Sequence, residues 1–126
     1  SDDPPPAPLF DRARALASVN QVEALLRELI EIFLDECPRQ SAEIESALAA
    51  DDRDAVRRLA HPLKNSLGYF GSDSIAGDAA GLQDSALDAR QNQLAERWQQ
   101  LKPRLAALEA DLRDYVRAGQ PVERTS

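Results

Sequence analysis

Apolar residues recur at steps of three and four residues through four long stretches of this chain, and this spacing constrains the fold more than any other feature. Such a repeat places apolar side chains on one face of an α-helix, which must then be buried against other helices. Glycine is scarce, at 5 residues, and aromatic residues make up 5%, so few signals favour strands. The expected helices run from about residue 21 to 49, 54 to 70, 73 to 86 and 94 to 116.

The connections between these helices are short, which favours neighbours that run antiparallel. A shorter apolar stretch at residues 9–16 predicts an N-terminal helix that packs across the others. The expected fold class is therefore all-α: an antiparallel up-down four-helix bundle with an additional short N-terminal helix. Cys37 and Trp98 fall on inward stripes and are expected in the core. Gly77 and Gly81 are expected to let helices crowd together inside the bundle.

Three prolines fall within the expected helices. A proline has no amide hydrogen, and its ring crowds the preceding turn. We expect a kink or short break at Pro38, and a bend or a separated first part of the helix at Pro103. Pro62 predicts a kink just ahead of His61, which would tilt the histidine ring. A tolerated kink without functional meaning is an equal alternative.

The two ends of the chain differ from its middle in composition. Residues 1–8 are polar and Pro-rich and are interpreted as a linker or tail, whereas residues 120–126 are expected to fray. The bundle is assigned to residues 9–119. Because the chain has no Met and opens on Ser1, we expect it to be a piece of a longer protein or a processed product.

The net charge of −7 argues against nucleic acid and anionic membrane surfaces as partners. One cysteine cannot form an internal disulfide, and no stretch reaches the 18 or so apolar residues of a spanning helix. A signal-peptide pattern is also absent. The sequence therefore predicts a cytoplasmic domain in a reducing compartment.

His61 is the one histidine of the chain. At about 100° per residue it falls roughly 140° from the apolar stripe of its helix and should face water. Arg57, Lys64, Asn65 and Gly68 surround it at helical spacing. A neutral imidazole is a good nucleophile near neutral pH, and nearby cations compensate the charge of a captured phosphate. A lone helical histidine is nevertheless more often an ordinary surface residue.

The string LAHPLKNSLGYFGSDS around this histidine gives it more weight. It resembles the signature of histidine phosphotransfer domains, A-H-x-L-K-(small)-S-x-x-x-(apolar)-G. The match also includes an acidic turn at Asp51 and Asp52, and Leu82-Gln83 where the family usually has Leu-Glu. The resemblance covers about residues 9 to 118. The residues that match the signature are Ala60, His61, Leu63, Lys64, Ser66, Phe70 and Gly71.

The resemblance implies that His61 is the phosphoacceptor, through Nε2, and that Lys64 stabilises the phosphorylated form. Asn65 and Gly68 would help to receive the partner, although the family usually has glycine at the position of Asn65. The implied role is that of a phosphorelay intermediate, which takes a phosphoryl group from a receiver-domain aspartyl phosphate and passes it to another receiver aspartate. Such a domain catalyses nothing alone and binds no cofactor. The magnesium ion is expected on the receiver.

A docking surface for the receiver is expected next to His61. The apolar arc of the helix at residues 21–49 extends from Ile32 through Val22 to Leu34, which is wider than one core face requires. One edge should remain uncovered as an apolar patch, and Leu34 and Arg57 are named as docking residues. Ordinary packing of the whole arc is an equal alternative.

Two other classes of function remain open. A helical scaffold or dimerisation module, in which His61 is incidental, would lose nothing in a His61→Ala variant. A small hydrolase that uses His61 as a general base lacks a visible nucleophile and a carboxylate to orient the ring. Gly-rich phosphate loops and His and Cys metal clusters are also missing from the sequence. We therefore expect a phosphocarrier, either cut from a hybrid sensor kinase or freestanding.

Overall fold

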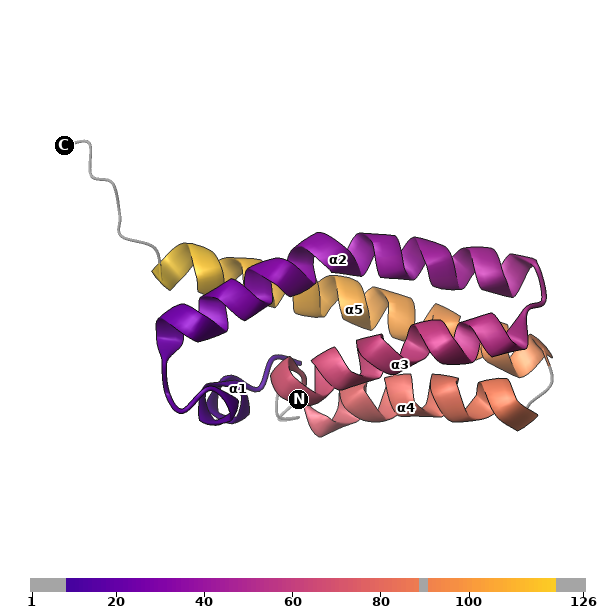
Figure 1. The fold of residues 1–126 in the computed structure, drawn as a ribbon, viewed down its shortest axis with the longest axis horizontal. Helices are drawn as coiled ribbons and strands as arrows, with labels where there is room; N and C mark the ends of the chain where they lie inside the picture. The colour runs from indigo at the N-terminus through magenta and orange to yellow at the C-terminus, as the bar shows by residue number, and fades with distance from the viewer. Residues whose placement is uncertain (1–8, 89–90, 120–126) are drawn as a thin grey trace, which may run out of the picture.

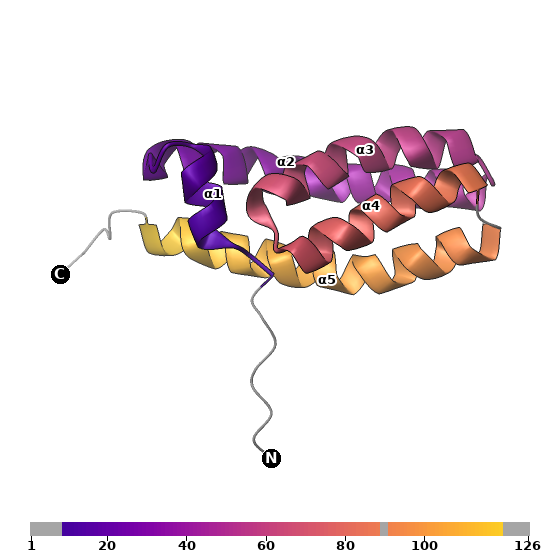
Figure 2. The same ribbon diagram turned by 90° about the horizontal axis from the view of Figure 1, so that it is seen from below.

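The computed structural model describes residues 9–88 and 91–119, and these residues form five α-helices in the expected order. Figure 1 shows four long helices side by side, each running opposite to the one before it. The short N-terminal helix lies across one end of the bundle (Figure 2). The predicted all-α antiparallel bundle is confirmed. The helices are α1 Arg12–Ser18, α2 Glu23–Ala49, α3 Arg53–Phe70, α4 Asp73–Asp88 and α5 Gln91–Gly119.

Local interactions set the two ends of α3. Asp51 turns the chain with a left-handed φ of 57°, and the Asp52 carboxylate then accepts a hydrogen bond of 3.1 Å from the Ala55 amide. Gly71 ends the helix with an extended backbone, so left-handed geometry does not require glycine there. A Cβ at Gly71 would lie 2.5 Å from Cγ2 of Ile75. Glycine is therefore needed to let α3 and α4 meet closely.

The core is built from the inward stripes that the sequence predicts, except at α2 and its N-cap, where three residues expected to face the core are exposed: Val22 at 48%, Leu25 at 41% and Leu29 at 37%. Every inward residue expected on α4 and on α5 is buried, including Trp98, and no polar or charged residue of the described ranges is fully buried. The Trp98 indole donates a 2.9 Å hydrogen bond to Glu45, which also pairs with Lys102 at 2.6 Å. Cys37 is buried as expected, and burial raises the pKa of its thiol to about 12. It therefore packs as a small hydrophobe.

The helices continue through Pro38 and Pro103, which excludes the break at Pro38 and the separated first part at Pro103. The alternatives, a kink at Pro38 and a bend at Pro103, stay predictions. Pro62 likewise lies within an uninterrupted α3. All three prolines are exposed. The carbonyl that each one leaves without a donor, four residues earlier, faces the same solvent side, where water can satisfy it. An exposed position explains why these helices tolerate proline.

The crowding expected at the glycines of α4 is also wrong for Gly77, because a Cβ added there would meet no atom within 4 Å. At Gly81 a Cβ would meet the end of the Arg97 side chain rather than a neighbouring backbone. Among the described residues, every helix is too short or too polar to form a transmembrane span. The linker expected at residues 1–8 and the tail expected at 120–126 lie outside the described residues.

Candidate functional site

His61 lies on the solvent-facing side of α3, near the middle of the helix. We call this side of the helix the crest of α3. Its neighbours Ala60 and Leu63 are fully buried, so the core fixes the rotation of α3 and turns His61 outward. The exposed position that the helical wheel predicts for His61 is therefore what the structure has. The imidazole can be reached by a partner while its backbone is held rigidly.

Two side-chain amides flank the imidazole ring. The amide nitrogen of Gln83, from α4, lies 3.2 Å from Nδ1 of His61, and the amide nitrogen of Asn65 lies 3.4 Å from Nε2. A neutral imidazole has one N–H donor and one acceptor nitrogen, so the two amides cannot both donate to it. One of them must present its oxygen.

Gln83 is the amide suited to present its oxygen. Its Oε1 is buried and has no hydrogen-bond partner in the described structure. A half-turn of the amide brings this oxygen to Nδ1, where it accepts the ring proton, while Asn65 still donates to Nε2. In this arrangement both ring nitrogens are satisfied and Nε2 of His61 carries the lone pair. That is the tautomer in which Nε2 is a nucleophile.

Basic side chains lie along the same crest. Arg57 and Arg58 form ion pairs of 3.1 and 3.2 Å with Asp54, and their hydrogen bonds hold the pKa of that carboxyl below its ordinary value, with Arg57 the larger cause. Together with His61 and Gln83, the two arginines line a shallow hollow of about 320 Å³. Positive charge therefore adjoins the imidazole.

A groove between α3 and α4 opens beside the histidine, with a volume of about 660 Å³. Lys64 is half-buried in its wall, and its ammonium pairs with no acid in the described part of the chain. A Cβ at Gly68 would meet no atom within 4 Å, so this part of the crest is low and open. We call it the α3–α4 groove; its lining is Lys64, Asn65, Gly68, Tyr69, Ala76, Gly77 and Ala80.

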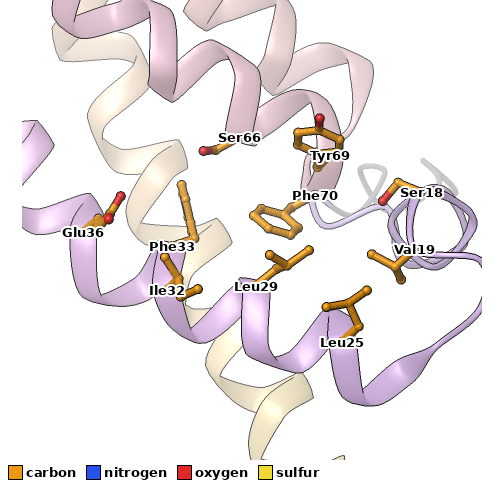
Figure 3. A pocket seen from close by; sticks show the side chains of 10 residues that line it. All are labelled: Ser18, Val19, Leu25, Leu29, Ile32, Phe33, Glu36, Ser66, Tyr69 and Phe70. Carbon is orange, nitrogen blue, oxygen red and sulfur yellow. The ribbon is translucent and has the colours of Figure 1, made fainter.

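The opposite flank of α3 carries an apolar groove of about 530 Å³, which Figure 3 shows between α2 and the end of α3. Ile32 is 54% exposed and Tyr69 is 56% exposed, which is unusual for such large apolar side chains. We call it the α2–α3 groove; its lining is Ser18, Val19, Leu25, Leu29, Ile32, Phe33, Glu36, Ser66, Tyr69 and Phe70. The uncovered edge of the arc is thus the Ile32 edge, whereas Leu34 is half-buried and packs against the core.

Each predicted site residue can now be placed. The structure brings Asn65 and Arg57 to His61, puts Lys64 and Gly68 in the adjoining groove, and leaves Leu34 away from the exposed apolar edge. Sequence reasoning gave Gln83 no role. Two signals pointed to it: Leu82-Gln83 stands where the family usually has Leu-Glu, and Gln83 directly follows inward-facing Leu82, which turns it towards α3.

Comparisons with known proteins agree with this geometry. Residues 28–117 match the Hpt domain family. The chain belongs to the Hpt domain family. It is 34% identical over 108 residues to chemotaxis protein CheA of Rhizobium meliloti strain 1021, an alignment that covers 78% of this chain and 14% of that protein. The chain therefore spans only a small part of this relative.

The fold of this Hpt domain also resembles a solved structure. The crystal structure of histidine-containing phosphotransfer protein B (HptB) from Pseudomonas aeruginosa PAO1 matches with a TM-score of 0.81. At 20% identity the match covers 91% of this chain and all of that chain, and it shows likeness of fold. The resemblance to histidine phosphotransfer domains predicted from the sequence is confirmed. The domain has a general role in histidine phosphotransfer.

Proposed function

We propose that this Hpt domain is a phosphorelay intermediate: His61 takes a phosphoryl group from the aspartyl phosphate of one receiver domain and passes it to an aspartate of another. The observation that carries the proposal is the exposed His61 ring on a basic helix crest, with a buried amide oxygen within a half-turn of its Nδ1. Membership of the Hpt domain family supports the same role.

The proposed step needs little from the domain beyond a positioned nucleophile. Nε2 of His61 attacks the phosphorus, an N–P bond forms, and the acyl phosphate O–P bond breaks with its electron pair returning to the aspartate carboxylate. The proton on Nδ1 stays on the ring. In the reverse step a carboxylate oxygen attacks the phosphorus and the N–P bond breaks. Transfer in both directions thus uses the same groups.

Three neighbours of His61 take distinct parts in this proposal. The Gln83 oxygen accepts the Nδ1 hydrogen and so holds the nucleophilic tautomer. The Asn65 amide leaves Nε2 when the phosphoryl group arrives and can then donate to a phosphoryl oxygen. Lys64 forms no ion pair within the described residues. Its ammonium group reaches from the α3–α4 groove and compensates the negative charge of the phosphoryl group.

The receiver is proposed to cover the crest of α3. Arg57 would face the acidic centre of the receiver, and the missing side chain at Gly68 would let the receiver come close. The docking role predicted for Leu34 is less well supported, because Ile32 rather than Leu34 lies on the exposed apolar edge of α2. We therefore expect the α2–α3 groove, rather than Leu34, to supply most of the apolar docking area.

Several further expectations accompany this role. No group of three His, Cys, Asp or Glu in the described ranges is placed to hold a metal ion, and we expect the magnesium ion on the receiver. A cytoplasmic location and an origin in a hybrid sensor kinase remain predictions from the sequence. The similarity to chemotaxis protein CheA makes chemotaxis receivers the first partners to test.

The test is phosphotransfer between the domain and a panel of receivers in magnesium, with His61→Gln as the control variant. We expect acid-labile, base-stable label on the wild type and none on His61→Gln. Because the chain has a single histidine, acid-labile label that is lost in His61→Gln is assigned to His61. A correctly folded wild type that stays unlabelled across the panel would instead favour the scaffold or dimerisation module.

A further inference from the structure

The hollow beside His61 is lined by hydrogen-bond donors and by no acid. Its lining consists of Arg57, Arg58, His61 and Gln83. Asp54 binds each arginine through one nitrogen only: Nη2 of Arg57 lies 3.1 Å from Oδ1, and Nε of Arg58 lies 3.2 Å from Oδ2. A guanidinium group has five N–H donors. The remaining nitrogens of both groups form no hydrogen bond within the described residues, so they can bind a second acceptor.

The ion pairs that hold these two arginines are exposed and therefore weak. The side chain of Asp54 is 67% exposed and that of Arg58 is 61% exposed. Water solvates separated charges almost as well as the ion pair does, so exposed pairs contribute little free energy. Asp54 also shares a single negative charge between two cations. Both arginines can therefore leave Asp54 at little cost when a stronger anion arrives.

A phosphoryl group on His61 is a stronger anion in the same place. A phosphorylated side chain carries a charge of about −1.5 to −2 and three acceptor oxygens, compared with one charge and two oxygens on a carboxylate. Arg57 and Arg58 precede His61 by four and three residues, the spacing at which side chains on a helix are neighbours. Guanidinium groups also bind phosphate oxygens through two parallel N–H donors. The phosphoryl group is thus the better acceptor for both arginines.

Asp54 has an ordinary structural role as well. It lies in the first turn of α3, where the helix dipole stabilises a carboxylate. That role requires no contact with an arginine, whereas the structure places one guanidinium group on each carboxylate oxygen. Asp54 therefore engages both arginines in the unphosphorylated domain.

We propose that Arg57 and Arg58 bind the phosphoryl oxygens of phosphorylated His61, and that Asp54 holds both arginines until the phosphoryl group arrives. The proposal rests on the proposed phosphorelay function, because that function puts the phosphoryl group on His61. It adds two cations to Lys64 as ligands of this group. It also makes Asp54 a positioning residue, whose competition for the arginines destabilises the phosphorylated form. Arg57 faces the receiver while the receiver is bound and turns to the phosphoryl group once the receiver leaves.

The test measures the equilibrium ratio of phosphorylated domain to phosphorylated receiver, at concentrations below the Kd of their complex. We expect Arg58→Gln to lower this ratio about fivefold, since one charge-assisted contact to the phosphoryl group is lost. Asp54→Asn should raise the ratio about threefold, because the competing carboxylate is gone. In a variant that carries Gln at both 57 and 58, Asp54→Asn should have no effect, because no arginine is left for Asp54 to hold.

Two matched controls change the same charges outside the hollow. Arg53→Gln removes an arginine of the same helix that does not line the hollow. Asp51→Asn removes a neighbouring carboxylate at a left-handed φ of 57°, which asparagine tolerates. Both controls should leave the ratio nearly unchanged.

Nitrogen NMR of the arginine side chains follows the change of partner directly. In the wild type the Nε signal of Arg58 should move on phosphorylation, because Nε leaves Asp54. In Asp54→Asn the same signal should already differ from that of the wild type before phosphorylation. A purely structural role of Asp54 predicts no change of the Arg58 signal when His61 is phosphorylated.

The possible failures are distinguishable. An equal loss in Arg53→Gln and Arg58→Gln would mean that net charge rather than the hollow stabilises the phosphorylated form, which overturns the proposal. An unchanged or lower ratio in Asp54→Asn, or an Arg58 signal that phosphorylation leaves in place, would overturn it too. In each of these cases the wild type still carries phosphate on His61 and the phosphorelay stands. Absence of phosphorylated wild type with every receiver would contradict the phosphorelay and the proposed arginine contacts together.

Discussion

The two flanks of α3 differ in what they offer a partner. On the side of α4 the histidine ring meets a polar side chain, and the adjoining groove is lined by small residues and Lys64. On the side of α2 large apolar side chains remain uncovered above a well-packed core. Chemistry and recognition are therefore assigned to opposite sides of one helix. Substitution of the α4 side chain that contacts the histidine ring should change the rate of transfer, and substitutions on the α2 side should change affinity.

The largest expected effect is on the α2 flank. Leu29→Asp places a charge in the α2–α3 groove at a residue that is already 37% exposed, so the fold should tolerate it. We expect the Kd for the receiver to rise about 30-fold, the loss of one interface hot spot, with the transfer rate at saturation unchanged. Isothermal titration against the receiver measures the Kd. Val22→Asp, exposed but outside the groove, is the control, and equal losses in both variants would mean that the groove is not the docking surface.

On the α4 flank, Gln83→Ala should slow transfer at saturating receiver about tenfold and leave the Kd unchanged, because one hydrogen bond to the ring is lost. Gln83→Glu keeps an acceptor for the Nδ1 hydrogen and should restore the rate. Nitrogen NMR of the single imidazole should show less Nδ1–H tautomer in Gln83→Ala. An unchanged tautomer ratio combined with weaker binding would make Gln83 a docking residue instead.

Two glycines test how far the receiver footprint extends. Alanine at Gly68 or at Gly77 meets no atom within 4 Å and should stabilise its helix by up to about 1 kcal/mol, measured by urea unfolding. Gly68→Ala should nevertheless weaken receiver binding several-fold, because the added methyl lies on the crest beside His61. Gly77→Ala should leave binding unchanged. A similar loss in both variants would extend the footprint onto α4.

The smallest effect is expected away from both flanks, at Glu45. Hydrogen bonds from Lys102, the larger cause, and from Trp98 hold the pKa of this carboxyl below its ordinary value. The stabilisation is therefore fully present above the ordinary pKa and is lost as the pH falls through the lowered, folded-state pKa. Compared with Glu45→Gln, the wild type should be more stable by less than about 1 kcal/mol at pH 7, an advantage that shrinks as acid protonates Glu45. Urea unfolding at pH 7 and in acid checks this, and phosphotransfer should be unaffected.

Much of the fold follows directly from the sequence. Steps of three and four residues located the helices, and the inward residues of α4 and α5 are buried as that spacing predicts. His61 was found on the solvent side by the same reasoning. The continuity of the helices through the prolines could not be predicted in this way, because the spacing rule alone does not show that a proline on an exposed face leaves its carbonyl accessible to water.

The contacts between helices were harder to foresee. Gln83 meets His61 across 22 residues of sequence, and the register of α4 against α3 is set by packing that a single sequence does not reveal. Which edge of the apolar arc of α2 stays exposed was equally hard to predict. Its apolar arc was visible, but only the placement of α1 and α3 shows that Ile32 is exposed while Leu34 packs on the core.

The most direct test of the central claim is a relay assay with two receivers and this domain between them. A labelled aspartyl phosphate on the first receiver should appear on the second only when the wild-type domain is present, with a transient acid-labile species on the domain. His61→Gln should give no transfer. Label reaching the second receiver at the same rate with His61→Gln, or without the domain, would contradict the claim that His61 carries the phosphoryl group.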